Sequence, residues 1–338
     1  MKVLVTGATG TFGRACVREL LAPDSQATAV VAFARSESRL AALKTVYADR
    51  AEFKPFLGDV RDLQRLTNAL VGVDVVIHAA ALKRVDDGAY NPSEMVATNI
   101  VGTQNICQAA TACGVSRVVM VSSDKAVEPW NIYGATKMVA EQQSIAFNSI
   151  AAPQGTRIAI VRYGNVIAST GSVLTIWTQA RDADRPLPVT DLSMTRFVLT
   201  IQDGVRFAIR AAMTLHGGEV FVPHLQSVKL SDFAEAFAPG YPTVTIGRRV
   251  GGEKPHEVLL SPDEHPRTVA SALGYVVTPP TTPWSWTTEQ PYADAVAPGW
   301  LTDEGWETIR YSSDNPRFLT HTAETMFPVI ARGLEEVV

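Results

Sequence analysis

The sequence has few cysteines, no long apolar run and no excess of positive charge. Its three cysteines, Cys16, Cys107 and Cys113, match neither a CxxC pair nor a metal-binding spacing, so we expect no metal site and a reducing compartment. No stretch approaches the roughly 18 apolar residues that a transmembrane helix needs. The first apolar run, Lys2–Thr6, is too short for the core of a signal peptide. We therefore expect a cytoplasmic protein with no membrane partner.

Charge is also sparse. The net charge is −4 over 338 residues, and 46% of the residues are hydrophobic against 19% charged. No block of lysine and arginine is present, which argues against nucleic acid as a partner. An anionic ligand would have to be held by individually placed arginines. The composition is that of a globular protein long enough for one large domain or two unequal ones.

Residues 1–165 alternate apolar runs with amphipathic stretches. This pattern predicts an α/β fold with a Rossmann-like, doubly wound parallel sheet and a smaller C-terminal substrate-binding lobe. The expected strands are Lys2–Thr6, Ala27–Ala34, Glu52–Leu57, Asp74–Ala79, Arg117–Val121 and Arg157–Arg162. The expected helices include Phe12–Leu21, Leu63–Leu70, Pro92–Cys113, Gln202–Leu215 and Ser231–Phe237.

The alternation of apolar runs and amphipathic stretches ends near residue 166, where prolines and glycines become frequent. We expect an NADP-binding Rossmann domain over 1–165, with room for later segments to return to its sheet. A nucleotide-sugar-binding lobe would span 166–275, and a C-terminal arm 276–338. Four of the six tryptophans fall between Trp284 and Trp306. That segment reads as a surface arm packed on the body or on a second subunit, with a lid as the alternative.

A glycine-rich loop follows the first expected strand directly. Its spacing is GxxGxxG, and it leads into an amphipathic helix. Bare backbone amides at a helix start can lie against a pyrophosphate, although a tight strand–helix turn would use the same glycines. The loop therefore predicts a dinucleotide site that includes Gly7, Thr9, Gly10, Thr11, Phe12 and Gly13.

The ends of the next strands indicate which dinucleotide binds. An NAD site usually has a carboxylate after the second strand, whereas this chain has Arg35 and Ser36, which suit a 2′-phosphate. We expect NADP, with NAD possible. Asp59, beside Val60, is placed to contact the adenine or to cap a helix. The small residues that end the fourth strand would let the backbone lie against the cofactor; they are Ala79, Ala80 and Ala81.

Two acid–base pairs lie close together in the sequence after the expected strand Arg117–Val121. Tyr133 and Lys137 are four residues apart and share a helix face, where an ammonium favours the phenolate. Asp124 and Lys125 precede them, either as a second acid and base or as a solvent-exposed loop pair. One Tyr/Lys pair serves hydride transfer. A second pair suggests that hydride transfer is coupled to an elimination.

These motifs resemble a known family. The glycine loop, His78-Ala-Ala-Ala-Leu-Lys83 and Tyr133-x-x-x-Lys137 resemble an extended short-chain dehydrogenase/reductase. Five further motifs resemble the UDP-N-acetylglucosamine 4,6-dehydratases: Ser123-Asp-Lys-Ala126, Arg162-Tyr-Gly-Asn165, Gly171-Ser-Val173, Met194-Thr-Arg-Phe197 and Gly252-Glu-Lys-Pro-His-Glu257. Asp124-Lys125 with an intact Tyr133 resembles the inverting branch, which opens pseudaminic acid biosynthesis.

The resemblance implies a role for each catalytic candidate. Tyr133, as phenolate, would take the proton of the sugar 4-hydroxyl, and Lys137 would lower its pKa and hold the nicotinamide ribose. Neutral Lys125 would remove the C5 proton, while protonated Asp124 would protonate the departing 6-hydroxyl. Ser123 would hydrogen-bond the 4-oxygen. Lys83 would serve the cofactor or the substrate.

The resemblance also implies a UDP-sugar substrate and a homo-oligomer, a dimer or a hexamer. The substrate-binding residues would be Lys83, Asn165, Val173, Thr190, Arg196, Arg249 and Glu253. The chain departs from the family pattern at several positions: Ala34, Ser36, Thr170, Thr175 and the longer Arg249-Val-Gly-Gly-Glu-Lys254. Three alternatives stay open: a 5-retaining nucleotide-sugar dehydratase, a 4-epimerase and a non-catalytic NADP-sensing regulator.

Overall fold

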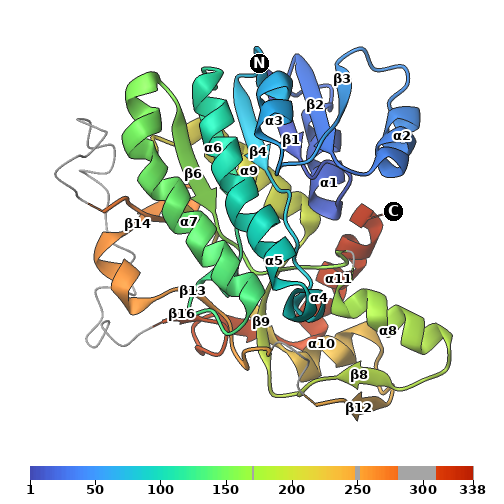
Figure 1. Ribbon diagram of the computed structural model, residues 1–338. Helices are drawn as coiled ribbons and strands as arrows, with labels where there is room; N and C mark the ends of the chain where they lie inside the picture. The colour runs from blue at the N-terminus through green and yellow to red at the C-terminus, as the bar shows by residue number, and fades with distance from the viewer. Residues whose placement is uncertain (170, 248–251, 281–309, 338) are drawn as a thin grey trace.

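The computed structural model describes residues 1–169, 171–247, 252–280 and 310–337. Its main sheet has the strand order β14-β15-β10-β6-β5-β4-β1-β2-β3 (Figure 1). The strands from β3 to β10 are parallel, and β15 and β14 are antiparallel additions at one edge. The strands are β1 Lys2–Thr6, β2 Ala29–Ala34, β3 Phe53–Leu57, β4 Val75–His78, β5 Arg117–Val121, β6 Arg157–Val161, β10 Val220–Val222, β14 Thr268–Ser271 and β15 Gly274–Val277. All six expected strands are present.

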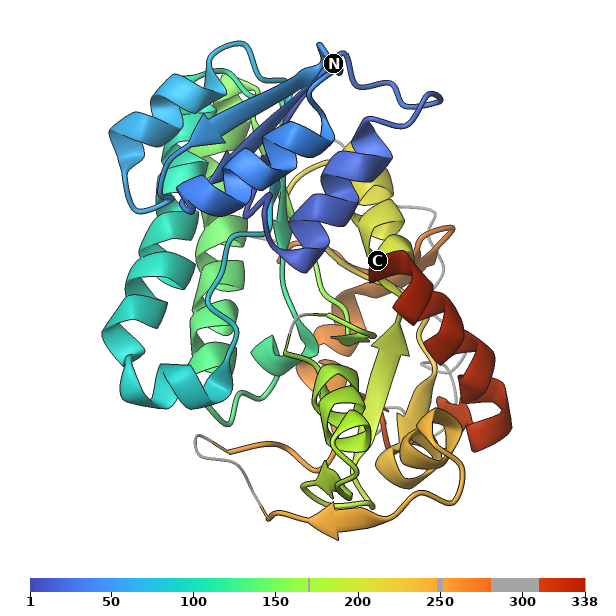
Figure 2. The same cartoon turned by 90° about the vertical axis from the view of Figure 1, so that its right-hand side faces the viewer.

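Helices cover both faces of this sheet, and Figure 2 shows the sheet between the two helical layers. Because side chains alternate along a strand, β1 supplies both cores: Val3 and Val5 join one, and Leu4 joins the other. The first core is closed by α1 Thr11–Leu20, α2 Glu37–Val46 and α9 Ile201–Thr214. The second is closed by α3 Leu63–Leu70, α6 Gly102–Ala112 and α7 Ile132–Ala151. The expected Rossmann-like, doubly wound fold is confirmed.

The expected helix Pro92–Cys113 is interrupted. After α4 Val85–Tyr90, the chain forms α5 Pro92–Met95, a π-helical segment Val96–Val101 and then α6. The wider turn carries Asn99, whose side chain accepts from Leu82 N (2.8 Å) and donates to Leu82 O (2.9 Å). This π segment therefore pins the loop that follows β4, beside the site described below.

A second unit is built from shorter elements. One sheet has the order β17-β11-β9-β7, and two strand pairs, β12-β8 and β13-β16, stand apart from it. Its strands are β7 Asn165–Val166, β8 Leu187–Val189, β9 Thr195–Leu199, β11 Ser227–Lys229, β12 Thr243–Thr245, β13 Val258–Leu260, β16 Tyr311–Ser312 and β17 Leu319–His321. Its helices are α8 Val173–Asp182, α10 Leu230–Phe237 and α11 Ala323–Val337. Trp177 lies fully buried at its centre, against Phe233 and Phe237.

The chain crosses between the two units more than once. Three strands from beyond residue 165 (β10, β14 and β15) return to the main sheet. Residues 311–337 do not extend away from the body, because β16 and β17 pair with β13 and β11 and α11 packs on α10. The tryptophan-rich segment falls outside the described residues. Within the described ranges, no helix is both long and apolar enough to cross a membrane.

Candidate active site

The glycine loop between β1 and α1 is closed tightly by backbone contacts. Gly7 has a φ of +66°, which favours glycine, and its O accepts from Gly10 N (2.9 Å). A Cβ on Gly13 would lie 2.2 Å from Gly7 O, and a Cβ on Gly7 would lie 2.9 Å from the backbone of Ala80. No larger residue fits at these positions, so the amides at the start of α1 stay accessible to a close ligand. A dinucleotide pyrophosphate fits this cradle.

The end of β4 is fixed against this loop by Thr6. Its Oγ1 accepts from Ala79 N and Ala80 N (3.1 Å each) and lies 2.8 Å from His78 Nδ1. Burial lowers the pKa of His78 to about 3, and the charge of Lys137 adds to the effect. His78 is therefore a neutral structural histidine that orients the loop carrying Ala81.

The residues expected to read the adenosine half lie along the carboxyl ends of β2 and β3. Arg35 is exposed just after β2, and Ser36 caps α2. Asp59 is already engaged, because Arg61 Nη2 lies 2.7 Å from its carboxylate. Burial raises the pKa of Asp59, but the hydrogen bonds from Arg61 bring it below the usual value. Val60 is buried against Gly102.

Tyr133 and Lys137 lie in the first two turns of α7, which Asn131 caps by accepting from Gly134 N (2.9 Å). Burial lowers the pKa of Lys137 to about 8, and its Nζ donates to Val121 O (2.6 Å). Burial raises the pKa of Tyr133, although Lys125 and a hydrogen bond with Ser123 oppose the rise. The pKa of Tyr133 therefore lies above its usual value, against the expected lowering, because burial outweighs the nearby cations.

Asp124 and Lys125 form a short 3-10 helix, Asp124–Ala126, rather than a solvent-exposed loop pair. Asp124 is fully buried, and its Oδ1 accepts from Ser123 Oγ (2.8 Å) and from Lys125 Nζ (3.1 Å). Burial raises the pKa of Asp124, with Lys125 opposing.

Lys125 differs from the expectation of a neutral base. Its Nζ also lies 3.3 Å from Glu257 Oε1 and donates to Asn165 Oδ1 (3.2 Å). Burial lowers the pKa of Lys125, but Asp124 and Glu257 raise it above the usual value. The two neighbouring carboxylates therefore favour the ammonium form of this lysine.

The candidate substrate residues divide into two groups and two individual residues. Lys83 and Arg196 lie within electrostatic reach of Lys125, and Asn165 bonds it directly. Thr190 Oγ1 donates to Glu253 Oε2 (3.0 Å), so these two form a separate pair. Val173 begins α8. Arg249 lies outside the described residues.

Two of these basic side chains already have partners. Arg196 Nη1 donates to Thr195 O (2.7 Å) and Pro255 O (2.9 Å). Lys83 Nζ donates to Ser169 Oγ (3.4 Å), and burial together with Lys125 lowers its pKa.

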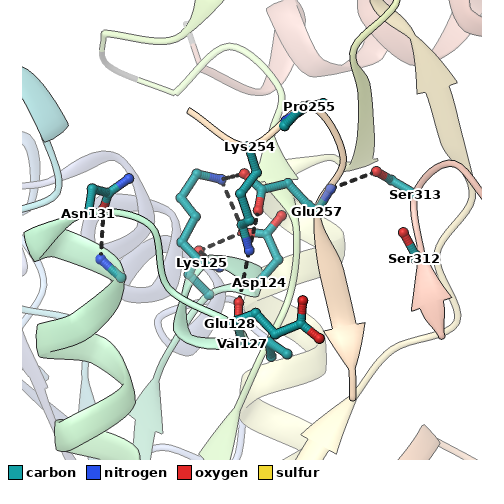
Figure 3. Close-up of polar contacts among 12 residues, drawn as sticks. Asp124, Lys125, Val127, Glu128, Asn131, Lys254, Pro255, Glu257, Ser312 and Ser313 are labelled. Carbon is teal, nitrogen blue, oxygen red and sulfur yellow. Dashed lines mark hydrogen bonds and ion pairs between the residues drawn. The ribbon is translucent and has the colours of Figure 1, made fainter. Parts of the chain in front are cut away.

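Sequence reasoning missed two residues that the fold brings to Lys125. Glu257 is 2% exposed, and Lys254 Nζ lies 2.9 Å from its Oε2 (Figure 3). Burial raises the pKa of Glu257, but Lys125, Arg196 and Lys254 bring it below the usual value. The Lys-x-x-Glu spacing within Gly252–Glu257 could have indicated an ion pair between Lys254 and Glu257. No feature of the sequence near Lys125 indicates that this pair would lie beside it.

The sequence is similar to those of known proteins over most of its length. Residues 3–278 match the model of a family described as polysaccharide biosynthesis protein. A Campylobacter jejuni protein named UDP-N-acetylglucosamine 4,6-dehydratase (inverting) is 39% identical over 278 residues, 82% of each chain. A Rickettsia massiliae UDP-glucose 4-epimerase is 33% identical over 78% of each chain.

The fold has a close match among solved structures. The X-ray structure of Pen from Bacillus thuringiensis superposes with a TM-score of 0.86 at 30% identity, covering 99% of this chain and 98% of that one. The family match spans the glycine loop, both acid–base pairs and the segment that carries Glu257. The chain therefore belongs to the polysaccharide biosynthesis protein family.

Proposed function

We propose that the protein is a nucleotide-sugar 4,6-dehydratase that converts UDP-N-acetylglucosamine to a UDP-4-keto-6-deoxy sugar with inversion at C5. The observation that carries this proposal is the second acid–base pair. Lys125 Nζ lies 3.1 Å from Asp124 Oδ1. Ser123 is hydrogen-bonded to both Asp124 and Tyr133, so it connects the two acid–base pairs. An epimerase needs only the Tyr/Lys pair. The 39% identity to a protein named for the inverting reaction supports the same substrate and stereochemistry.

The glycine cradle, Ala79–Ala81 and Lys137 would hold a nicotinamide dinucleotide. The cofactor supplies a hydride acceptor for C4 and a hydride donor for C6, so it is not consumed. We propose NADP, because Arg35 is exposed after β2, where a ribose 2′-phosphate would lie.

Tyr133 would take the proton of the 4-hydroxyl, with Ser123 donating to the same oxygen. Lys137 provides the cation that stabilises the phenolate once the site is closed. With a pKa of about 8 it retains its proton on much of the protein at neutral pH. The 4-keto group that results makes the C5 hydrogen acidic, which prepares the elimination.

Asp124 and Lys125 would then carry out the elimination without an outside proton. The ion pair and its neutral form, a carboxylic acid beside an amine, contain the same number of protons. The neutral form arises by transfer along the 3.1 Å contact between Lys125 Nζ and Asp124 Oδ1. Lys125 takes the C5 proton as the C5–C6 double bond forms, and Asp124 protonates the departing hydroxyl to give water. The pair thus ends as the ion pair of this structure.

The substrate diphosphate and uridine would lie between the units. We propose Arg196 and Arg249 as phosphate-binding residues, Asn165 as a diphosphate contact, and Glu253 with Thr190 at the uridine ribose. Val173 would border this site, and Lys83 would reach the sugar or the nicotinamide. Arg196 would have to exchange a carbonyl partner for phosphate.

A homo-oligomer is part of the proposal. The outer surface around α6 and α7 exposes several large apolar side chains, which a helical subunit interface would cover. They are Val96, Val101, Met138, Val139 and Ile150. Cytoplasmic localisation and a role in pseudaminic acid biosynthesis stay predictions.

Incubation with UDP-N-acetylglucosamine in D₂O tests the proposed function. The reaction would end with return of the hydride to C6 and addition of a proton to C5 from the face opposite to the one from which the base removed it. We expect proton NMR to record a 4-keto-6-deoxy product with inverted C5 and deuterium at C5, since the added proton would come from solvent. Retention at C5 would contradict the inverting assignment, and a 4-epimer without loss of water would favour the epimerase. If the protein binds the cofactor but does not turn over UDP-N-acetylglucosamine, either another nucleotide sugar is the substrate or the protein is a non-catalytic NADP-sensing regulator.

Arg35 tests the cofactor assignment. Replacing it with glutamate is expected to weaken NADP binding by about 100-fold, because one charged phosphate contact is lost and repulsion is added. NAD binding should change little or improve. The measurement is the dissociation constant of each dinucleotide from the cofactor-free protein. Arg39→Glu, an exposed arginine on α2, is the matched control. Equal loss of NAD and NADP would contradict the assignment.

A further inference from the structure

The segment Gly252–Glu257 contacts the loop between β5 and α7 at three points, and Figure 3 shows those made by Lys254 and Glu257. That loop carries Asp124 and Lys125. The three contacts are Asn131 Nδ2 donating to Gly252 O (3.1 Å), Lys254 Nζ donating to Val127 O (2.8 Å) and Lys125 Nζ lying 3.3 Å from Glu257 Oε1. The contacts run from Lys125 to Asn131, the residue before α7, so the segment holds the second part of the loop at several points.

Glu257 is itself held from the second unit. Its backbone N donates to Ser313 Oγ (2.9 Å), and that hydroxyl donates to Thr195 O (3.1 Å) in β9. Its carboxylate lies between two lysines, with Lys254 Nζ on Oε2 at 2.9 Å. A carboxylate fixed from several directions and 2% exposed has little freedom to move. It therefore supplies a fixed acceptor on one side of Lys125.

Three oxygen atoms lie close to Lys125 Nζ. It donates to Asp124 Oδ1 (3.1 Å) and to Asn165 Oδ1 (3.2 Å), and it forms an ion pair with Glu257 Oε1 (3.3 Å). When the proton passes to Asp124, Asn165 and Glu257 remain as neighbours of the amine. These two side chains therefore restrict the position of Lys125 Nζ.

We propose that Glu257, held in place by Lys254, is a positioning residue for Lys125 in the elimination step. The inference rests on the proposed dehydratase function. Within the described residues, Glu257 makes no hydrogen bond or ion pair with Tyr133 or Lys137. Its charge helps to raise the pKa of Tyr133, so its removal should not slow proton transfer from the 4-hydroxyl. We therefore expect its loss to slow C5 proton removal and not hydride transfer at C4. Misplacing a catalytic group by about 1 Å can cost 100-fold in rate. Loss of this acceptor is expected to fall in that range.

Glu257→Ala and Glu257→Gln test the proposal in the full-length protein. We expect kcat to fall about 100-fold in the alanine variant, with little change in KM. Glutamine keeps an oxygen acceptor at the same length, so its loss should be about tenfold. Glu128→Gln is the matched control, since Glu128 lies in the same loop and pairs with Arg310 (3.0 Å) instead of Lys125. Its kcat should equal that of the wild type.

Isotope effects separate positioning from general damage. If elimination becomes limiting, the effect of deuterium at C5 rises in both variants, whereas the effect of deuterium at C4 falls towards unity. Unchanged kcat, or equal slowing of both steps, would overturn the proposal. Circular dichroism shows whether each variant folds. If the alanine variant does not fold, the isosteric glutamine variant still tests the proposal. Absence of dehydratase product from the wild type would instead refute the proposed function.

Discussion

Replacing Tyr133 with phenylalanine is expected to lower kcat by roughly 10²- to 10⁴-fold, the range that a positioned general acid–base group contributes. The change removes one oxygen from a side chain that is 9% exposed. That oxygen would take the proton of the 4-hydroxyl. Without the 4-keto group the C5 hydrogen is not acidic, so Asp124 and Lys125 cannot act either. One substitution therefore stops both halves of the reaction.

The measurement is product formation by NMR together with deuterium uptake at C5 in D₂O. Both should fall by the same factor, because the second step depends on the first. Cofactor content and melting temperature should match the wild type, since the ring and its packing stay. A variant that retained turnover within a few-fold would remove Tyr133 from the mechanism. If the variant lost turnover but still fulfilled the biological role of the protein, the non-catalytic NADP-sensing regulator would be favoured.

The parts of this protein that sequence predicts well are local ones. The loop from Gly7 to Gly13 lies within a few residues of β1 and α1, and Gly13 is required by contacts with Gly7 and Ala8 inside that turn. Tyr133 and Lys137 share a helix face through their four-residue spacing alone. The six expected strands follow from apolar runs with no partner specified. Each of these depends on neighbours in the chain.

What the sequence did not predict depends on segments far apart in the chain. The charge state of Lys125 was expected to be neutral, yet Glu257, from the segment before β13, holds it as an ammonium. Burial raises the pKa of Tyr133, whereas the sequence predicted a lowered value. The four-residue spacing between Tyr133 and Lys137 gives no information on burial. The chain is helical from Pro92 to Ala112, as expected, but it contains a π segment at Val96–Val101, where Asn99 bonds the backbone of Leu82. Each outcome required the tertiary structure.

A buried charge cluster beside the site was also absent from the sequence reasoning. Arg162, at the end of β6, is 3% exposed and lies between two carboxylates: Glu141 of α7 (2.6 Å) and Glu264 (2.9 Å). It also donates to Leu259 O (2.9 Å). The arginine thereby joins α7, which carries Tyr133 and Lys137, to the segment that follows β13.

Arg162→Met is therefore expected to destabilise the protein by about 3–5 kcal/mol, because two buried carboxylates lose their cation. The measurement is urea unfolding of both proteins at about pH 8 and about pH 5. Arg206→Met is the matched control: its ion pair with Glu19 is as short (2.8 Å) but exposed. Such a pair contributes about 0–1 kcal/mol. Equal effects of the two substitutions would contradict the argument.

The pH dependence of this loss has a defined sign. In the wild type, burial raises the pKa of Glu264 but Arg162 brings it below the usual value. Its contribution is therefore present above the unfolded pKa of about 4.3 and is lost only as the pH falls through the lower folded value. Without Arg162, burial raises the pKa of Glu264, so this carboxyl group takes up a proton more readily in the folded state than in the unfolded state. Stability of the variant then rises on acidification, so the difference between the proteins should be smaller at about pH 5 than at about pH 8. A difference that grew on acidification would show that Arg162 acts through packing and not through its charge.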